Sequence, residues 1–436
     1  MGHQASPHAG ELHHAERRLP ANVPPFTVKA GQAAPRVIFV NRYFHPDLSA
    51  TSQLLSDLAF HLANERRVVH VVTSRHSYAD PSVFWPAEET TRGVFVHRVW
   101  TSAFGRARLW ARSLDYVTFY CSAFVMLLRI VRRGDILVAK TDPPLVSVVA
   151  CIVARLRGAR LINWVQDLFP EVATALRVSG PGFLTALLRA WRNRSMQGAV
   201  ANVVLGTRMK ERLEQEGLQR SRIKVIHNWA DGRAVYPVES ERNPLRPAWG
   251  LDRKCVVGYS GNLGRAHEFR TLLDAAEALV DRDDIVFLFI GEGAQLPLIK
   301  QHAKEKALHN VVFKPYQPRE LLGLSLSAAD VHIVSLNPCL EGLIVPSKFY
   351  GVAAAGRPVI FIGSPTGEIP TLIEQAGCGW TVEPSDPTRL ARIIRALGDD
   401  EAERRRLGRR ARETFERHFD GALAFRAWES VLNEAA

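Results

Sequence analysis

PCLEGLIVPSKFYGVAAAGRPVI, residues 338–360, is the stretch that decides the fold of this chain. An apolar run, VHIVSL (331–336), precedes it, and a second run, PVIFIG (358–363), closes it. The pattern predicts a strand, a loop, a short helix and another strand, which is the repeating unit of an α/β protein. In open α/β sheets, ligands bind outside the carboxyl ends of the strands, where this loop falls.

Lys348 lies in the first turn of the predicted helix, which begins near Pro346 and Ser347. The free N–H groups and the positive dipole end of a helix disfavour a cation at that position unless an anion is bound there. Lys348 is therefore a candidate phosphate clamp. The alternative is a surface lysine on an ordinary helix, and the pattern by itself does not separate the two.

Length and composition place the chain among globular proteins of about two domains. It has 436 residues, of which 47% are hydrophobic and 23% are charged. The formal net charge of +12 indicates an acidic partner, such as nucleic acid, an anionic membrane or a phosphorylated substrate. The five cysteines are far apart and form no C-x-x-C pair, which argues for a reducing compartment and against a structural zinc site.

Composition along the chain predicts the domain boundaries. Residues 1–34 are rich in Ala, Pro and Gly and are expected to be a disordered tail. A β-α-β pattern opens at residue 36, and residues 35–236 are predicted to form a first parallel, doubly wound α/β domain. We interpret the proline-rich residues 237–250 as a linker and residues 251–419 as a second α/β domain.

Two apolar stretches, residues 116–131 and 145–156, are candidates for membrane spans. Both are shorter than the ~20 residues that cross a bilayer. We therefore predict that they are buried helices of the first domain and that no helix spans a membrane. No secretory signal is visible in residues 1–34, which lack an apolar segment.

Two glycine-rich turns follow predicted strands of the second domain: Gly261-Asn262-Leu263-Gly264, with Arg265 beside it, and Gly291-Glu292-Gly293. Such turns suit phosphate groups because glycine lets the backbone approach closely, although the chain has no Walker loop. The first βα turn, residues 42–47, has no G-x-G-x-x-G pattern, which counts against a nicotinamide or flavin dehydrogenase.

Asp167 is the first candidate for a catalytic or acceptor-binding carboxylate. It follows Gln166 at the end of the predicted strand 161–165, where a side chain faces any cleft between the domains. Glu171 is the second candidate. The alternative for Asp167 is a helix N-cap, which is a frequent role of Asp.

The order of several motifs resembles the retaining glycosyltransferases of family 4, which have the GT-B fold. In the second half the motifs are YSGNLGRAHEF (259–269), FLFIGEGAQL (287–296), ADVHIVSL (329–336) and EGLIVPSKFYGVAAAGRPVI (341–360). In the first half they are RVIFVNRYFHPDLSATSQLLSDLA (36–59), KTDPPL (140–145) and NWVQDLFPEVA (163–173). The resemblance covers nearly the whole chain except the tail, and it is greatest to the subgroup that builds bacterial O-antigen, capsule and colanic-acid-type polysaccharides.

The resemblance implies two Rossmann-like, doubly wound parallel-sheet domains that face each other across a cleft. A carboxyl-terminal helix, about residues 420–436, would pack back on the first domain. The second domain would hold a nucleotide-diphosphate sugar, with uracil as the expected base, and the first domain would hold the acceptor. No cofactor, metal ion or nucleic acid is expected.

The resemblance also assigns a donor site. The first acid of the family's E-x7-E signature falls on Glu341, which would contact the sugar, whereas the second falls on Phe349 and is lost. Glu368 would replace it on the ribose. The other donor-site residues would bind the diphosphate (Gly261, Asn262, Arg265, Gly291, Gly293, Ser347 and Lys348) or the base (Tyr316 and Gln317).

On the acceptor side, Gln166 and Asp167 fall on the family's His-Asp position, and Tyr43, His45 and Glu171 complete the expected site. The resemblance implies retention by front-face attack, in which the leaving phosphate takes the acceptor proton and Asp167 orients the acceptor hydroxyl. Fixed cations would stabilise the charge on the phosphate without a metal ion. Metal independence is expected because the donor site has no Asp-x-Asp motif.

Members of this subgroup extend sugars carried on an isoprenoid diphosphate. We therefore expect a lipid-linked or saccharide acceptor and a cytoplasmic protein at the inner face of the cytoplasmic membrane. Arginines of the first domain would hold it against anionic lipid as a peripheral protein. These arginines are Arg106, Arg108, Arg112, Arg189 and Arg192.

Three other interpretations remain open. A sugar-nucleotide 2-epimerase of the same fold would need several acids in the cleft, and the first half offers few. A degenerate sugar-nucleotide-binding scaffold agrees with Phe349 at the second signature position. A nucleic-acid binder is suggested by charge alone, because no recognised module is present.

Overall fold

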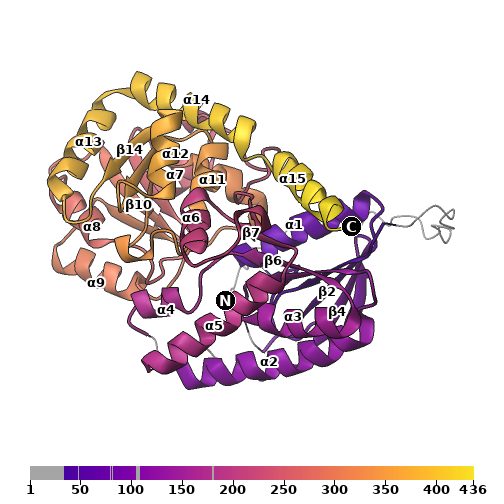
Figure 1. Cartoon of the computed structure of the whole chain (residues 1–436). Coiled ribbons are helices and arrows are strands. Elements are labelled where there is room, and N and C mark those ends of the chain that lie inside the picture. Colours follow the sequence, from indigo (N-terminus) through magenta and orange to yellow (C-terminus); the bar gives the residue numbers. More distant parts are fainter. Residues whose placement is uncertain (1–33, 48, 79, 81, 105–108, 179–180) are drawn as a thin grey trace, which may run out of the picture. The chain divides into compact units, whose positions relative to one another are not determined.

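A computed structural model describes residues 34–436, except 48, 79, 81, 105–108 and 179–180. Residues 35–436 form one compact unit with two β-sheets (Figure 1). The predicted tail lies outside the described residues, apart from residue 34. The prediction of two parallel-sheet α/β halves is confirmed.

The first sheet has eight strands in the order β3-β4-β2-β1-β5-β6-β7-β8. Every pairing is parallel except that of β3 with β4. The order reverses between β1 and β5, which makes the sheet doubly wound and puts a switch point at their carboxyl ends. The strands are β1 (Val37–Val40), β2 (Val69–Ser74), β3 (Glu88–Thr91), β4 (Val94–Val99), β5 (Ile136–Lys140), β6 (Arg160–Val165), β7 (Ala201–Val204) and β8 (Ile223–Val225).

Helices cover both faces of the first sheet, and its central strands β1 and β5 are accordingly buried at every position. One set of alternate strand residues packs with α1 and the carboxyl-terminal helix α15, and the other set packs with α2 and α3. In α15, Trp428 lies against Trp164 of β6, with 4.7 Å between ring centroids. The helices of this half are α1 (Ala50–Asn64), α2 (Leu109–Ile130), α3 (Val146–Arg157), α4 (Glu171–Ala175), α5 (Gly182–Gly198), α6 (Thr207–Gln215) and α15 (Gly421–Glu434).

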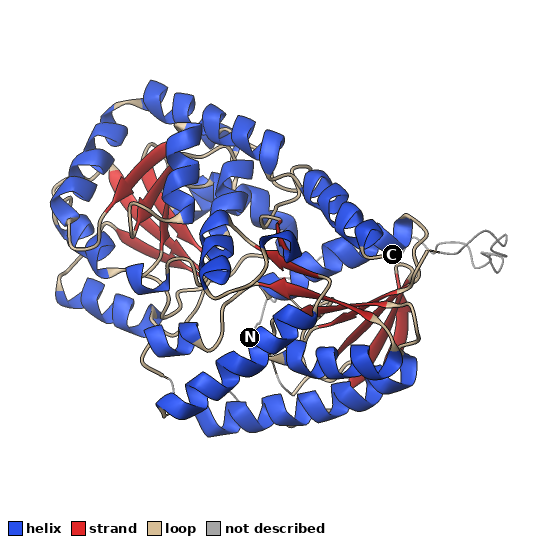
Figure 2. Ribbon diagram, viewed as in Figure 1, coloured by secondary structure: helices blue, strands red, loops and turns tan. Residues whose placement is uncertain are grey.

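The second sheet has six parallel strands in the order β11-β10-β9-β12-β13-β14 (Figure 2). Its switch point lies between β9 and β12, so the turn after β9 and the loop after β12 share one edge. The strands are β9 (Cys255–Ser260), β10 (Ile285–Ile290), β11 (Val311–Lys314), β12 (Val331–Ser335), β13 (Val359–Ile362) and β14 (Gly379–Val382). The helices are α8 (Arg270–Glu277), α9 (Leu296–Glu305), α10 (Leu322–Ser327), α11 (Lys348–Ala354), α12 (Glu368–Ala376), α13 (Pro387–Asp399) and α14 (Glu401–His418).

The segment between the sheets is anchored to the second sheet. It contains the 3-10 turn Ser240–Arg242 and the short helix α7 (Leu245–Trp249). The buried Arg246 of α7 forms an ion pair with Asp330 at 3.0 Å, and Asp330 also accepts a hydrogen bond from the backbone N–H of Val256 at 2.8 Å. The proline-rich segment is therefore packed beside strand β9.

The prediction that both apolar stretches form buried helices is wrong for much of their surface. The first belongs to the 22-residue helix α2, which is long and apolar enough to cross a membrane by length and composition, yet only 22% of its most apolar window is buried. Phe119, Ala123 and Leu127 pack against the sheet, whereas Val117 and Val125 are about half exposed. Hydrophobicity alone does not reveal which side of such a helix meets the core.

Candidate active site

Lys348 begins α11 and meets His267, which lies in the turn after β9. The distance from Lys348 Nζ to His267 Nε2 is 2.9 Å, and His267 Nδ1 lies 2.6 Å from the carbonyl oxygen of Ser335. Because a carbonyl only accepts, Nδ1 carries the proton and Nε2 accepts from the Lys348 ammonium. One neutral imidazole therefore links β12 to the lysine and fixes its position.

Two glycine-rich turns come together beside this lysine. At Gly261 the backbone has φ +122°, and an added Cβ would lie 2.9 Å from Lys348 Cε. At Gly291 it has φ +132°, and an added Cβ would collide with the carbonyl of Gly261. Gly293, at φ +153°, meets the carbonyl of Leu263 in the same way. Only glycine allows this close approach, which brings the turns after β9 and β10 against Lys348.

Burial lowers the pKa of Lys348 to about 7, and burial together with the Lys348 charge lowers the pKa of His267 to about 3. Among the described residues, no carboxylate forms an ion pair with Lys348. A cation held without a counter-ion is a binding place for an anion, since a bound anion would restore its preference for the charged form.

Three more predicted donor-site residues lie beside these turns. Asn262 is exposed, and its carbonyl oxygen accepts a hydrogen bond from the Tyr259 hydroxyl at 3.1 Å. Arg265 is exposed, and Ser347 is exposed at the N-cap position of α11, where its side chain makes no capping hydrogen bond. The helix starts at Lys348, two residues after Pro346, and has only seven residues.

A cavity of about 190 Å³ adjoins the second glycine-rich turn. It is lined by Gly291, Glu292, Leu296, Lys300, Phe313, Lys314 and Pro315. Tyr316 and Gln317 follow directly in the chain; Tyr316 is half exposed, and Gln317 donates a hydrogen bond to the carbonyl of Pro315 at 2.9 Å. Burial, with the charges of Tyr78 and Glu292, raises the pKa of Tyr316 to about 12.

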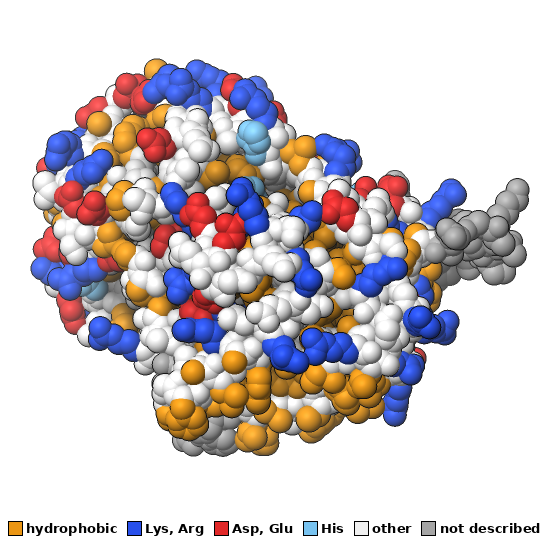
Figure 3. All heavy atoms as spheres, in the orientation of Figure 1, with side chains coloured by type: hydrophobic (Ala, Val, Ile, Leu, Met, Phe, Trp, Pro, Cys, Tyr) orange, Lys and Arg blue, Asp and Glu red, His pale blue; other side chains and the backbone are white. Residues whose placement is uncertain are grey.

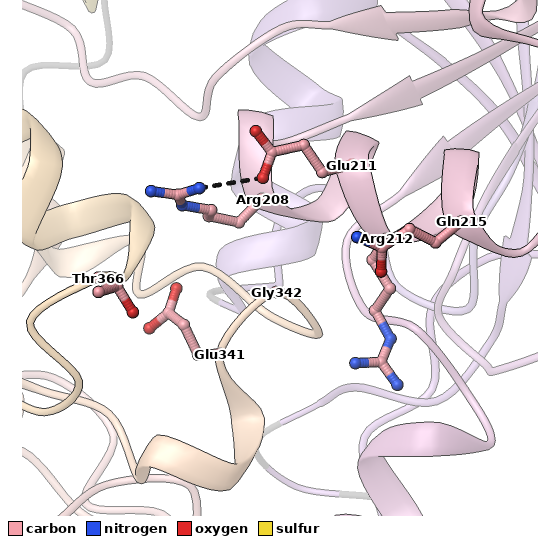
Figure 4. A pocket seen from close by; sticks show the side chains of 7 residues that line it. All are labelled: Arg208, Glu211, Arg212, Gln215, Glu341, Gly342 and Thr366. Carbon is pink, nitrogen blue, oxygen red and sulfur yellow. Dashed lines mark hydrogen bonds and ion pairs between the residues drawn. The ribbon is translucent and has the colours of Figure 1, made fainter.

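Glu341 lines a second cavity, of about 240 Å³, whose opposite wall is α6 (Figure 4). Glu341 Oε1 accepts a hydrogen bond from the backbone N–H of Glu368 at 2.9 Å, and burial raises the pKa of Glu341. Arg208 contributes a cation to this cavity, and its Nη1 lies 3.0 Å from Glu211 Oε2. The remaining lining residues are Arg212, Gln215, Gly342 and Thr366.

Sequence reasoning missed Arg208, although a signal was present. Arg208 lies in the first turn of a helix that follows the carboxyl end of a strand, β7, which is the pattern that singled out Lys348. Such a cation is poorly placed for the helix dipole without an anion nearby. The missed signal therefore concerned the first half of the chain, where arginines were considered only for contact with lipid.

The structure argues against the ribose role predicted for Glu368. Its side chain is buried, and Oε2 accepts a hydrogen bond from the backbone N–H of Arg208 at 3.0 Å. An added Cβ at Gly206 would collide with the same carboxylate. Glu368 therefore caps the amino terminus of α6, and this contact occupies an oxygen that the ribose role would require. The position of the lost second acid, Phe349, is fully buried in the core.

Asp167 lies in a loop that meets the Glu341 loop. Its backbone forms an antiparallel bridge with Ile344, and the N–H of Leu168 donates to the carbonyl of Leu343 at 2.9 Å. The Asp167 carboxylate reaches solvent on one side. Desolvation by the surrounding protein, together with the charge of Asp142, raises the pKa of Asp167 to about 6. The neighbouring Gln166 is buried and donates to Asn228 Oδ1 at 3.4 Å.

Tyr43 and His45 shape the loop after β1. Tyr43 is buried and packs edge-on against Tyr78, with 5.1 Å between ring centroids. Burial and the charge of Arg92 lower the pKa of His45, and the carbonyl of His45 accepts a hydrogen bond from Arg98 at 2.6 Å. Both residues are therefore held in place by the first half of the chain.

The prediction that Glu171 faces the acceptor is wrong. Glu171 is buried, and it forms ion pairs with Arg192 at 2.7 Å and with Arg189 at 2.8 Å. Arg192 is also buried and bonds to Glu216, so its predicted contact with lipid is wrong too. This network joins α4, α5 and α6 internally. Arg106 and Arg108 lie outside the described residues, and Arg112 is exposed.

Lys140, which sequence reasoning did not single out, ends β5 close to Asp167. Its side chain is completely buried, and its Nζ lies 3.4 Å from the centroid of the Trp164 ring. Nζ has no hydrogen-bond partner in the structure, and burial lowers its pKa well below the ordinary value. The charges of Asp142 and Asp167 act in the opposite direction. A lysine that ends an apolar strand directly before Thr141-Asp142 was the available signal.

Among the described residues, one group of possible metal ligands lies on α8 and α9. The chain does contain one Asp-x-Asp sequence, residues 281–283, but it precedes β10, whereas the glycine-rich turn follows that strand. Elsewhere, ligand atoms of Asp274, Glu277 and His302 lie within 4.8 Å of one another. Two of these residues are already paired, Asp274 with Arg270 and Glu277 with Lys306, each at 3.0 Å.

Comparison with known families and relatives agrees with this architecture. Residues 6–229 match the Glycosyl transferase 4-like domain, and residues 241–414 match Glycosyl transferases group 1. The chain is 31% identical over 290 residues to the probable glycosyltransferase WbjE of Pseudomonas aeruginosa, covering 66% of this chain and 72% of WbjE. It is 26% identical over 250 residues to the putative colanic acid biosynthesis glycosyl transferase WcaI of Escherichia coli K12, covering 56% of this chain and 61% of WcaI.

Solved structures share the fold at low sequence identity. Sucrose-phosphate synthase from Thermosynechococcus elongatus superposes with a TM-score of 0.71 at 16% identity, covering 92% of this chain and 98% of that one. HepE of Anabaena, in complex with UDP and glucose, has a TM-score of 0.68 at 17% identity, with coverage of 92% and 100%. The expected GT-B fold and family are confirmed, and the chain belongs to the GT4-type glycosyltransferases of the GT-B fold.

Proposed function

We propose that this glycosyltransferase moves a sugar from a UDP-sugar to a lipid-linked or saccharide acceptor in surface polysaccharide biosynthesis, with retention at the anomeric carbon. The relative WcaI is described as acting in colanic acid biosynthesis. HepE, which shares the fold, was solved with UDP and glucose. The first description supports a role in polysaccharide biosynthesis, and the second supports a nucleotide-sugar donor for this chain.

The observation that carries the proposal is Lys348. Its ammonium is held by His267 at 2.9 Å, next to the Gly261 and Gly291 turns, and among the described residues it has no carboxylate partner. A diphosphate there would meet a fixed cation and a backbone without side chains. The charge that develops on the β-phosphate as the sugar leaves would be stabilised by this arrangement. The cavity beside Gly291 then offers room for the base.

The proposed reaction needs no nucleophile from the protein. The acceptor oxygen attacks the anomeric carbon on the face that the phosphate leaves, the bond from that carbon to the phosphate oxygen breaks, and the acceptor proton passes to the leaving phosphate. Glu341 and Arg208, on opposite walls of the larger cavity, would hold the sugar. Asp167 would orient the acceptor hydroxyl, because the Asp167–Ile344 bridge brings it to the Glu341 loop.

Asp167 provides a test of the acceptor side. Its pKa is raised to about 6, so the carboxylate is ionised above that pH and can accept a hydrogen bond from the acceptor hydroxyl. We expect transfer to fall below about pH 6, and Asp167→Asn to lose at least about tenfold in kcat and to remove this limb of the pH profile. An Asp167→Asn enzyme with full activity and an unchanged profile would remove Asp167 from the site.

The donor site is tested by calorimetric titration with UDP, GDP and ADP in EDTA. We expect UDP to bind without a metal ion. Lys348→Ala and Lys348→Met should weaken binding by about tenfold or more, since a charge-assisted contact to phosphate is lost. Lys306→Ala, which removes an exposed lysine of the same half, is the control and should bind UDP normally.

Two outcomes would change the proposal. Binding that requires a divalent ion would overturn metal independence. Failure of all three nucleotides to bind would mean that the Lys348 region is not a diphosphate site. Binding of a nucleotide without any transfer activity would favour a degenerate sugar-nucleotide-binding scaffold, which the buried Phe349 at the second signature position already suggests.

The proposed location is the inner face of the cytoplasmic membrane, where a lipid-linked acceptor and a soluble sugar nucleotide meet. Fractionation of cells that express the full chain tests it. The protein should be recovered with the inner membrane at low ionic strength and should be released in part by salt. Recovery in the soluble fraction alone under both conditions would contradict this location.

A further inference from the structure

Three helices of the first half share an outer surface of apolar side chains, which we call the apolar face. α2 packs on α3, and α3 packs on α5. The face is defined by six side chains that are 43–77% exposed. They are Val117 and Val125 of α2, Leu156 of α3, and Phe183, Leu187 and Trp191 of α5.

In α5 the usual arrangement of a surface helix is reversed. Phe183, Leu187 and Trp191 follow one another at a spacing of four residues and therefore lie on one side, which is exposed. The residues that the helix buries are Arg192, Ser195 and Met196. Exposure of an apolar stripe to water is unfavourable, so this side of the helix is expected to be covered by another surface.

The position of α2 limits what can cover this face. Phe119, Ala123 and Leu127 on its inner side are fully buried in the core of the first sheet. With that side held by the sheet, α2 presents only its outer side, along which Val117, Cys121 and Val125 recur at a spacing of four. Its geometry therefore suits contact along a surface and not passage through a bilayer.

The charges around the apolar face have one sign. On α2, α3 and α5 the exposed charged side chains among the described residues are six arginines, one of which, Arg189, is paired with Glu171 of α4: Arg112, Arg129, Arg155, Arg157, Arg189 and Arg194. The one acid on these helices, Asp115, is buried and accepts a hydrogen bond from the Ser102 hydroxyl at 2.7 Å. Figure 3 shows hydrophobic side chains gathered over α2 and α5, with Lys and Arg along the border.

We propose that the apolar face rests on an anionic lipid bilayer. Its aliphatic and aromatic side chains insert between the headgroups, and the arginines lie at the level of the lipid phosphates. Apolar side chains surrounded by arginines match such a surface on both counts. This inference deepens and rests on the membrane location proposed above, but it needs neither donor nor acceptor to be identified.

The test is cosedimentation of the full chain with vesicles of phosphatidylcholine, alone or with 30% phosphatidylglycerol. Wild type should bind the anionic vesicles at least about tenfold more strongly than the neutral ones. The triple variant Phe183→Ser, Leu187→Ser, Trp191→Ser should lose at least about tenfold in partitioning. Leu298→Ser is the matched control, because Leu298 is 63% exposed on α9 of the other half, and it should bind like wild type.

A second readout reports where the lipid lies. Cys121 and Cys339 are the exposed cysteines, and Cys121 lies on the outer side of α2. We attach an environment-sensitive dye to Cys121 in a Cys339→Ser background. Its fluorescence emission should move to shorter wavelength on anionic vesicles and should be quenched by spin-labelled lipid. The same dye on Cys339, in a Cys121→Ser background, should not respond.

Two results would overturn the inference. One is equal vesicle binding by wild type and the triple variant, with no response at Cys121. The other is a wild type that is dimeric without lipid while the triple variant is monomeric, which would mean that a second copy covers the apolar face. UDP binding by each variant is measured in parallel, so that failure of the donor site is seen separately from failure of lipid binding.

Discussion

At the scale of residues, the site depends on charges held where water is scarce. Lys348 has a partly desolvated ammonium with a histidine partner, and Lys140 has a fully buried amine over an indole ring. In both cases the charged form is disfavoured by burial. The two lysines differ in access, since Lys348 lies at the edge of the glycine-rich turns and Lys140 is enclosed.

Donor binding should take up a proton above neutral pH. With a pKa of about 7, Lys348 is largely neutral at pH 8, and a bound diphosphate would favour the ammonium. Affinity for UDP should therefore fall as the pH rises through 7. Calorimetry at pH 8 in buffers of different ionisation enthalpy should reveal proton uptake in wild type, and Lys348→Met should show none. Uptake of the same size in Lys348→Met would assign the proton to another group.

Lys140→Met should stabilise the fold. The folded pKa of Lys140 lies well below that of the unfolded chain, so the unfolded state binds the proton more tightly and folding of the wild type is penalised at neutral pH. Met keeps the packing on Trp164, and the free energy of unfolding should rise by about 1–3 kcal/mol at pH 7. The gain should shrink as the pH approaches about 10, the ordinary lysine pKa. Urea unfolding at both pH values measures this, and a destabilised variant would mean that the cation–ring contact dominates.

At the scale of elements, two helices are tied together by one carboxylate. Glu368 begins α12, yet its side chain caps the first turn of α6 in the other half, and its own N–H donates to Glu341. Both walls of the larger cavity therefore depend on these two acids. The roles predicted for them were donor contacts, whereas their hydrogen bonds in the structure are helix caps.

Glu368→Ala should destabilise the fold by about 0.5–2 kcal/mol, the usual cost of removing a helix cap. The change leaves the N–H of Arg208 without its acceptor and removes a negative charge from the positive end of α6. Urea unfolding checks this, with Glu374→Ala as the control because Glu374 is exposed on the same helix, α12. Equal stability of the two variants would mean that the cap contributes nothing.

At the scale of the whole molecule, the carboxyl-terminal helix packs on the first sheet and not on the second. After the second sheet is complete, α15 returns to the first sheet, and Trp428 packs against Trp164 and among the residues of α1 and β1. The last strand of the second sheet is thus followed by helices that pack in three different hydrophobic clusters, and only α15 belongs to the cluster of the first sheet.

Trp428→Ala should cost about 3–5 kcal/mol, because the side chain is fully buried and leaves a cavity. The loss of stability should be confined to the first sheet and the helices that cover it. Hydrogen exchange should quicken in α1 and β6 and stay unchanged in β9 and β10. Trp191→Ala, which removes an exposed tryptophan, is the control and should change stability by less than about 0.5 kcal/mol. Faster exchange in both sheets would show that they unfold as one cooperative unit.

The sequence by itself determined the fold class, the family and the position of Lys348. The fold class and the lysine follow from local patterns: apolar runs that alternate with helical segments, glycine-rich turns after strands, and a cation in the first turn of a helix. The family follows from the resemblance carried by several motifs in order along the chain. Each pattern is written within a few residues, so a single chain reveals it.

Only the tertiary structure decided how the acids are used and which apolar surfaces are buried. Glu171 and Glu368 are near strand ends in sequence, but their partners, Arg192 and Arg208, lie 21 and 160 residues away. The outward side of α2 and α5 depends in the same way on which neighbours pack against each helix. Contacts between distant residues are set by the packing of whole elements, and no local pattern encodes them.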